Sequence, residues 1–219
     1  MVKRREFDHG LEELQSLLGE MGRRAEEALG ASMKALVDMN ADAAREIIGQ
    51  DLELNHLEMK VTELGARLIA TQQPVAKDLR SILAAFKISS DLERMGDLAV
   101  DIAKVVVRLE GQKLIKPLID LPRMAEIVQT MIRESVRSYV DGNVDLAYKM
   151  AKDDDAVDAL YSQIIRELFT LMVEDPKTIN QSMLLSFVGR YIERIADHAT
   201  NIGENTVYLV MGKRPELNS

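Results

Sequence analysis

The chain has 219 residues, of which 47% are hydrophobic and 29% charged, and its formal net charge is −8. This balance is typical of a folded, highly charged globular protein, and it argues against bulk binding of nucleic acid, which requires an excess of Lys and Arg. The chain contains no Cys, which excludes disulfides, thiolate metal sites and Cys nucleophiles.

Helical periodicity dominates the first half of the chain. Apolar residues recur at three- and four-residue spacing from Leu11 to Leu36, which predicts a long first helix. Asn40-Ala41-Asp42 interrupts this pattern and supplies a cap for a second helix of about thirty residues. Pro74 suits the start of the next helix, because proline lacks only an N–H that the first turn leaves unused. A third helix is therefore expected from about Val75 to Leu109.

The second half repeats this order after a break at residues 111–117. Pro122 lies just beyond this break, and a fourth helix then passes through Met124 and Tyr139 and ends at Asp141-Gly142-Asn143. A fifth helix begins at Asp145, and a sixth covers Ile179 to about Val210. Short turns between long helices imply antiparallel neighbours. We therefore predict an all-α fold of six long helices, arranged as two tandem three-helix bundles over residues 1–112 and 113–219.

A polar motif supports the idea of an internal duplication. Glu93-Arg94-Met95-Gly96-Asp97 returns one hundred residues later as Glu193-Arg194-Ile195-Ala196-Asp197. Six of the seventeen positions are identical between residues 91–107 and 191–207, and Asn40 and Asp51 match Asn143 and Asp154 at a separation of 103. A fixed separation indicates a duplicated supersecondary unit.

The duplicated motif places acidic residues on one face of each helix. At 100° per residue, residues 93, 97 and 101 share one narrow sector, opposite the apolar face, and residues 193, 197 and 201 do the same. Stacked carboxylates repel one another unless a cation compensates them. Oxygen ligands suit hard or borderline cations, and we expect Fe, Mn, Mg, Ca or Zn. The candidate metal ligands are Glu93, Asp97, Asp101, Glu193, Asp197, Asn201 and, on helices two and five, Asp51, Asp154 and Asp158.

Other interpretations of these residues remain open. The acidic faces could be ordinary solvated surfaces, and Arg94 and Arg194 could form intrahelical ion pairs instead of contacting a partner. Glu53-Leu54-Asn55-His56 fits the ligand pattern of di-iron bundles, but the second half lacks its counterpart. A carboxylate bundle with a redox or storage role and a generic helical scaffold therefore stay as alternatives. No catalytic motif is present, so we do not expect an enzyme.

The chain resembles the PhoU family, which regulates bacterial phosphate uptake. The resemblance covers nearly the whole length and is most specific in the duplicated E-R-x-x-D motif and in Gln73-Pro74-Val75-Ala76-Lys77-Asp78-Leu79-Arg80. In the family, this segment reads Q-P-x-A-x-D-L-R and opens the third helix. The E/D-x-x-x-D motif, through which some members bind metal clusters, corresponds to Glu93/Asp97 and Glu193/Asp197. Relatives often carry Asn at the position of Asp101, and Asn201 follows that habit.

The resemblance implies a cytoplasmic, non-enzymatic regulator. Such a protein would couple the ATPase subunit of a phosphate ABC transporter to a membrane sensor histidine kinase, restraining both when phosphate is plentiful. A homodimer is implied as well. We find no secretory signal peptide and no apolar run of the roughly 20 residues that a membrane span needs. Membrane association is therefore expected only through partners, and no nucleic-acid partner is expected.

Overall fold

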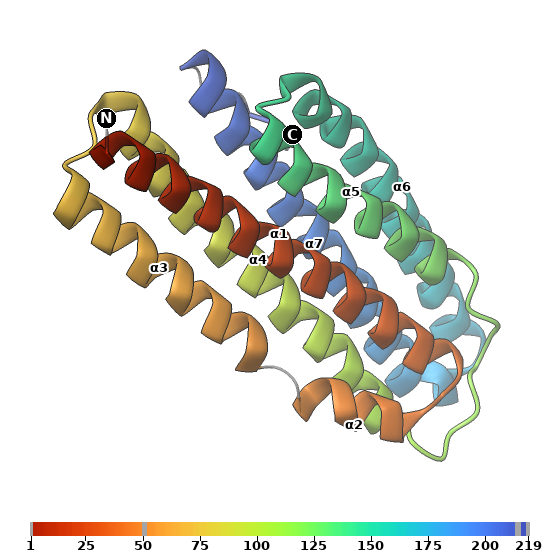
Figure 1. Cartoon of the computed structure of the whole chain (residues 1–219). Helices are drawn as coiled ribbons and strands as arrows, with labels where there is room; N and C mark the ends of the chain where they lie inside the picture. The colour runs from red at the N-terminus through yellow and green to blue at the C-terminus, as the bar shows by residue number, and fades with distance from the viewer. Residues whose placement is uncertain (1, 50–51, 213–215, 218–219) are drawn as a thin grey trace.

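The structure, a computed structural model, describes residues 2–49, 52–212 and 216–217. The first half consists of α1 (Val2–Val37), α2 (Ala41–Gly49), α3 (Leu52–Gln72) and α4 (Ala76–Arg108). The second half consists of α5 (Asp120–Asp141), α6 (Val144–Glu174), the 3₁₀ turn η1 (Pro176–Thr178) and α7 (Ile179–Met211). The predicted second helix corresponds to α2 and α3, on either side of residues 50–51. The predicted all-α architecture of two tandem three-helix bundles is confirmed (Figure 1).

The same capping chemistry sets equivalent helix starts in the two halves. The Oδ1 atom of Asn40 accepts a hydrogen bond of 3.0 Å from the backbone N–H of Ala43. The Oδ1 atom of Asn143 accepts from Asp145 N at 3.0 Å and from Leu146 N at 3.3 Å. Both side chains thus satisfy N–H groups that a helix start leaves unpaired.

Two helix boundaries follow from Gly and Pro. Gly142 ends α5 in the left-handed region, with φ 62°, where glycine carries no steric penalty. At the other end of α5, the helix begins at Asp120, so that Pro122 lies inside the first turn and not before the helix. A proline is tolerated there because the first turn has no intrahelical acceptor for its N–H.

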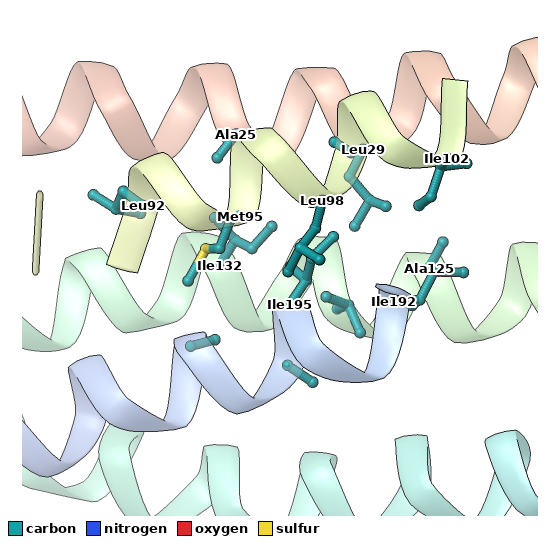
Figure 2. Close-up of a cluster of buried hydrophobic side chains, with 14 of the residues drawn as sticks. Ala25, Leu29, Leu92, Met95, Leu98, Ile102, Ala125, Ile132, Ile192 and Ile195 are labelled. Atoms are coloured by element: carbon teal, nitrogen blue, oxygen red, sulfur yellow. The ribbon is translucent and has the colours of Figure 1, made fainter. Parts of the chain in front are cut away.

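The hydrophobic core is continuous between the two halves. Buried side chains of α1, α4, α5 and α7 meet in one cluster at the centre of the molecule (Figure 2). Leu92, Met95 and Ile102 of α4 and Ile192 and Ile195 of α7 are fully buried in it. The helices α3 and α6 lie along opposite edges of this central layer (Figure 1). Each outer helix therefore presents one face to its own half and the other to solvent.

The segment between the halves is fixed to α7. The Oε1 atom of Gln181 accepts a hydrogen bond of 2.6 Å from Ile115 N, and its Nε2 donates to Lys113 O at 3.1 Å. Gln181 is itself buried, so its polar atoms require such partners. Every described helix falls short of the combined length and apolarity that a membrane span requires.

Candidate functional site

Each half gathers acidic side chains where its outer helix packs on a central one. Within one helix, residues at i and i+4 share a face, and the packing of α3 on α4 and of α6 on α7 adds a second row. We call Asn55 and Glu58 of α3 with Glu93 and Asp97 of α4 the first cluster. We call Asp154 and Asp158 of α6 with Glu193 and Asp197 of α7 the second cluster. The structure thus brings together most of the predicted acidic residues, half by half.

The first cluster is largely compensated by neighbouring side chains. Glu93 is only 8% exposed, and its Oε1 accepts a hydrogen bond of 3.2 Å from Asn55 Nδ2. Arg94 donates to Asp97 Oδ2 at 2.9 Å, and its Nε lies 3.6 Å from Glu93 Oε2. Burial raises the pKa of Glu93, and the charges of Asp97 and Glu58 raise it further, while Arg94 opposes them. This cluster therefore keeps a modest excess of negative charge.

The second cluster buries carboxylate oxygens that have no hydrogen-bond partner among the described residues, and Asp154 shows this most clearly. Asp154 is 7% exposed, and its Oδ1 has no hydrogen-bond partner among the described residues. Burial raises its pKa from the ordinary 3.8 to about 7, with further contributions from the charges of Asp158, Asp197 and Glu193. A buried carboxylate without a partner is costly, because desolvation disfavours its charged form. An added cation or a proton would relieve that cost.

Glu193 and Asp197 of α7 are carboxyl groups whose pKa values are also raised by burial. Arg190 donates a hydrogen bond to Glu193 Oε1, but Glu193 Oε2 is buried without a partner among the described residues. Burial is the main cause that raises the pKa of both carboxyl groups, and Asp158 raises both. Arg190 and Arg194 lower both pKa values, but the net direction is still upward. The second cluster is thus rich in carboxylate oxygens and poor in donors.

The remaining predicted residues lie apart from the two clusters. Asp101 lies one turn beyond Asp97 on α4, and its Oδ1 forms an ion pair of 2.7 Å with Lys104 Nζ. Asp51 lies outside the described residues. Asn201 lines a polar hollow between α4 and α7, together with Lys87 and Glu204. Arg94 and Arg194 are exposed beside the clusters. The proposed metal role of Asp101, Asn201 and Asp51 stays a prediction, as does partner binding by the two arginines.

Sequence reasoning missed two arginines that bear on the clusters. Arg190 stands three residues before Glu193, a helical spacing that could have indicated the contact, but the equivalent residue in the first half is Ser90. Arg24 of α1 pairs with Glu20 at 3.0 Å and also with Glu53 of α3. Together with Glu93 and Asp97, it lines a cavity between α1, α3 and α4. The contact with Glu53 depends on helix packing, for which the sequence carries no local signal.

The donor set suits a hard or borderline cation. Asp154, Asp158, Glu193 and Asp197 offer only oxygen ligands, and two of their buried oxygens lack other partners among the described residues. Over those residues, however, no three His, Asp or Glu side chains already stand in a metal-holding arrangement. The chemistry of the second cluster fits a cation, and its side chains would have to reorient to ligate one.

Fold and site together define a class: a duplicated helical bundle with one carboxylate cluster in each half. The sequence profile of the PhoU domain matches the chain twice, at residues 18–106 and 121–206. The chain belongs to the PhoU family.

Known relatives agree in sequence and structure. A "phosphate-specific transport system accessory protein PhoU homolog" of Clostridium acetobutylicum is 43% identical over 99% of this chain and 100% of its own length. A homologue with the same name from Aquifex aeolicus is 42% identical over 93% of this chain and 92% of its own. The crystal structure of PhoU from Pseudomonas aeruginosa superposes with a TM-score of 0.90 at 34% identity, covering 94% of this chain and all of that one. The "phosphate transport system regulatory protein PhoU" of Streptococcus pneumoniae gives 0.89 at 28% identity, covering 96% and 99%.

Proposed function

We propose that the protein is an accessory regulator of phosphate uptake that couples a phosphate ABC transporter to a sensor histidine kinase. When phosphate is plentiful, it keeps the kinase from activating the phosphate-starvation response and restrains the transporter. Membership of the PhoU family and the names of its relatives support the link to phosphate transport. The observation that carries the proposal is the pair of carboxylate clusters at equivalent places in the two halves.

The clusters are proposed to act as electrostatic docking surfaces. A partner that presents Lys or Arg would offset the negative charge of Asp154, Glu193 and Asp197, whose pKa values are raised first by burial and further by neighbouring carboxylates. Such complementarity speeds association and selects the partner more than it adds affinity. Under this proposal the protein works in the cytoplasm as a homodimer, without catalysis, and reaches the membrane only through the transporter and the kinase.

A bound cation is a second part of the proposal. Asp154, Asp158, Glu193 and Asp197 would hold it in the second half, and Glu58, Glu93 and Asp97 in the first. A cation supplies positive charge that offsets the buried carboxylates, so its presence would decide how much negative charge each surface shows to a partner. Fe, Mn, Mg, Ca and Zn all accept oxygen ligands, and the donor set does not select one of them.

The test replaces each acidic pair in cells that carry a reporter of phosphate-starvation genes. We expect Glu193→Ala with Asp197→Ala to release repression in high phosphate, and Glu93→Ala with Asp97→Ala to release it in part. The exposed pair Glu12→Ala and Glu13→Ala removes the same charge from α1 and serves as the control. If both cluster variants accumulate as folded protein and repression persists, the carboxylate clusters are not the working surface.

A further inference from the structure

A patch of exposed apolar side chains lies at the end of the second half, where α6 turns through η1 into α7. Large apolar residues are normally exposed singly, and such cases need no explanation. Here, five of the fifteen that the described part of the chain exposes fall within residues 169–187. We call these five the apolar patch: Phe169, Val173, Ile179, Met183 and Phe187.

The apolar patch continues the face that carries the second cluster. Phe169 follows Asp158 by eleven residues, about three turns, and therefore lies on the same side of α6. Met183 precedes Asp197 by fourteen residues, about four turns, and lies on the same side of α7. Tyr161 packs against Gly189, which sets α6 and α7 side by side at this level. An acidic area and an apolar area thus adjoin along one outer face.

The first half does not repeat the apolar patch. At the separations that align the halves, Phe169 and Val173 correspond to Ala66 and Ala70, and Phe187 corresponds to Lys87. Only Leu79 and Leu83 match Ile179 and Met183 in character. Because the first bundle forms without these large side chains, the fold itself does not require them. Their exposure in the second half therefore calls for a different cause.

The acidic part of this face also differs between the halves. Asp158 replaces Asn55, which in the first half donates a hydrogen bond to Glu93. At this position the second half therefore carries a carboxylate in place of a donor beside its large apolar residues, while Tyr161 stands where the first half has Glu58. A complementary surface would combine aliphatic or aromatic side chains with Lys or Arg on one flank. A basic amphipathic helix has this composition.

We propose that the apolar patch and the second cluster together form the docking surface for a basic amphipathic helix of a partner protein. The apolar face of that helix covers Phe169, Met183 and Phe187, and its Lys and Arg side chains lie over Asp158 and Glu193. The inference rests on the proposed function, because it assigns one of the partner contacts to the second half alone. Docking of an amphipathic helix depends on a few large apolar anchors at its centre.

Binding of two purified probes tests the assignment: the ATPase subunit of the phosphate transporter and the cytoplasmic part of the sensor kinase from the same organism. The patch variant carries Phe169→Ala, Val173→Ala and Phe187→Ala. The control carries Leu52→Ala, Met59→Ala and Val75→Ala, which remove three exposed apolar side chains from the first half without changing the charge. We expect the patch variant to raise the Kd of at least one probe by about tenfold or more, and the control by less than about twofold.

Three results would overturn the assignment, after circular dichroism has shown that both variants are folded. Wild-type binding of a probe that neither variant weakens places docking elsewhere and leaves the proposed function intact. A patch variant that turns a dimer into a monomer, with both probes bound as before, assigns the patch to a second copy of the chain. Wild-type protein that binds neither probe contradicts the proposed function, and the inference falls with it.

Discussion

Asp154 is the residue of the second cluster whose ionisation costs the most free energy in the folded protein. Its carboxyl group is 7% exposed, and its pKa of about 7 arises first from burial and then from the charges of four neighbouring carboxylates. Relative to the ordinary value of 3.8, ionisation in the folded state costs on the order of 4 kcal/mol. A fold that kept this residue only for stability would do better with an uncharged side chain.

The pH dependence of unfolding tests this cost in metal-free protein. Below pH 4 the carboxyl group is protonated in both the folded and the unfolded protein. Between pH 4 and pH 7 the unfolded protein loses this proton more readily than the folded one, so the free energy of unfolding falls as the pH rises through 7. Asp154→Asn removes this loss of stability, so we expect the Tm of the variant to exceed that of the wild type increasingly from pH 4 to pH 7, and by a constant margin above pH 7. Asp141→Asn, an exposed carboxylate paired with Arg137, should show no such widening. Parallel Tm curves for Asp154→Asn and wild type would contradict the account.

Asp158 and Asn55 occupy equivalent positions and separate the two clusters chemically. Asp158→Asn removes one negative charge from the second cluster, and Asn55→Asp adds one negative charge to the first. Titration calorimetry with Mn²⁺ should show the affinity of the second half fall by about tenfold or more in Asp158→Asn. In Asn55→Asp, the affinity of the first half should rise. Unchanged affinities in both variants would mean that these positions do not contact a cation.

The sequence predicts the acidic residues better than their surroundings. Glu93, Asp97, Glu193 and Asp197 could be chosen because a duplicated motif at helical spacing places them on one face. Whether each carboxylate is compensated depends on side chains from other helices, as with Asn55 and Glu93. Such contacts follow from the rotation of one helix against another, which a local pattern does not specify.

At the scale of the helices, close packing depends on small residues at particular positions. Gly65 of α3 faces α4, where an added Cβ would overlap the ring of Phe86. Gly65→Ala should therefore destabilise the protein by about 1–3 kcal/mol, because the ring has to move. Gly19 of α1 has no heavy atom near an added Cβ, so Gly19→Ala should stabilise by about 0.5–1 kcal/mol through helix propensity. Urea unfolding of both variants measures the difference, and a Gly65→Ala variant as stable as wild type would refute close packing of α3 on α4.

Most helix ends follow from local chemistry, and the starts of α1 and α5 are exceptions. Periodicity and the breaks at Asn40-Ala41-Asp42 and Asp141-Gly142-Asn143 predict the starts near residues 41 and 144 and the end of α5 at Gly142. The pattern around Pro122, by contrast, does not give the start of α5, which lies at Asp120. A proline marks the first turn without stating which position of that turn it takes. The extension of α1 back to Val2 likewise has no strong apolar signal.

At the scale of the whole molecule, the duplication explains the architecture and leaves the asymmetry as the functional clue. Two copies of one unit share a core formed by α1, α4, α5 and α7, which repeats the apolar positions of each half. The shared core was not predicted, because a repeat fixes each bundle but not the way two bundles face one another. The outer faces have diverged: Asp158 stands where the first half has Asn55, Tyr161 stands where it has Glu58, and the apolar patch lies in the second half. Because the core is repeated and these surface residues are not, the fold does not require the surface differences.

Under the proposed function, the second cluster is a surface that takes up positive charge, from a cation or from a partner. The most direct measurement is the metal content of untagged protein purified without chelators, for the wild type and for Glu193→Ala with Asp197→Ala. We expect the wild type to carry bound cation, and the variant to lose the part held by the second half while remaining folded. A metal-free wild type whose Tm does not rise when Mn²⁺ or Fe²⁺ is added would contradict a cation site in the second cluster.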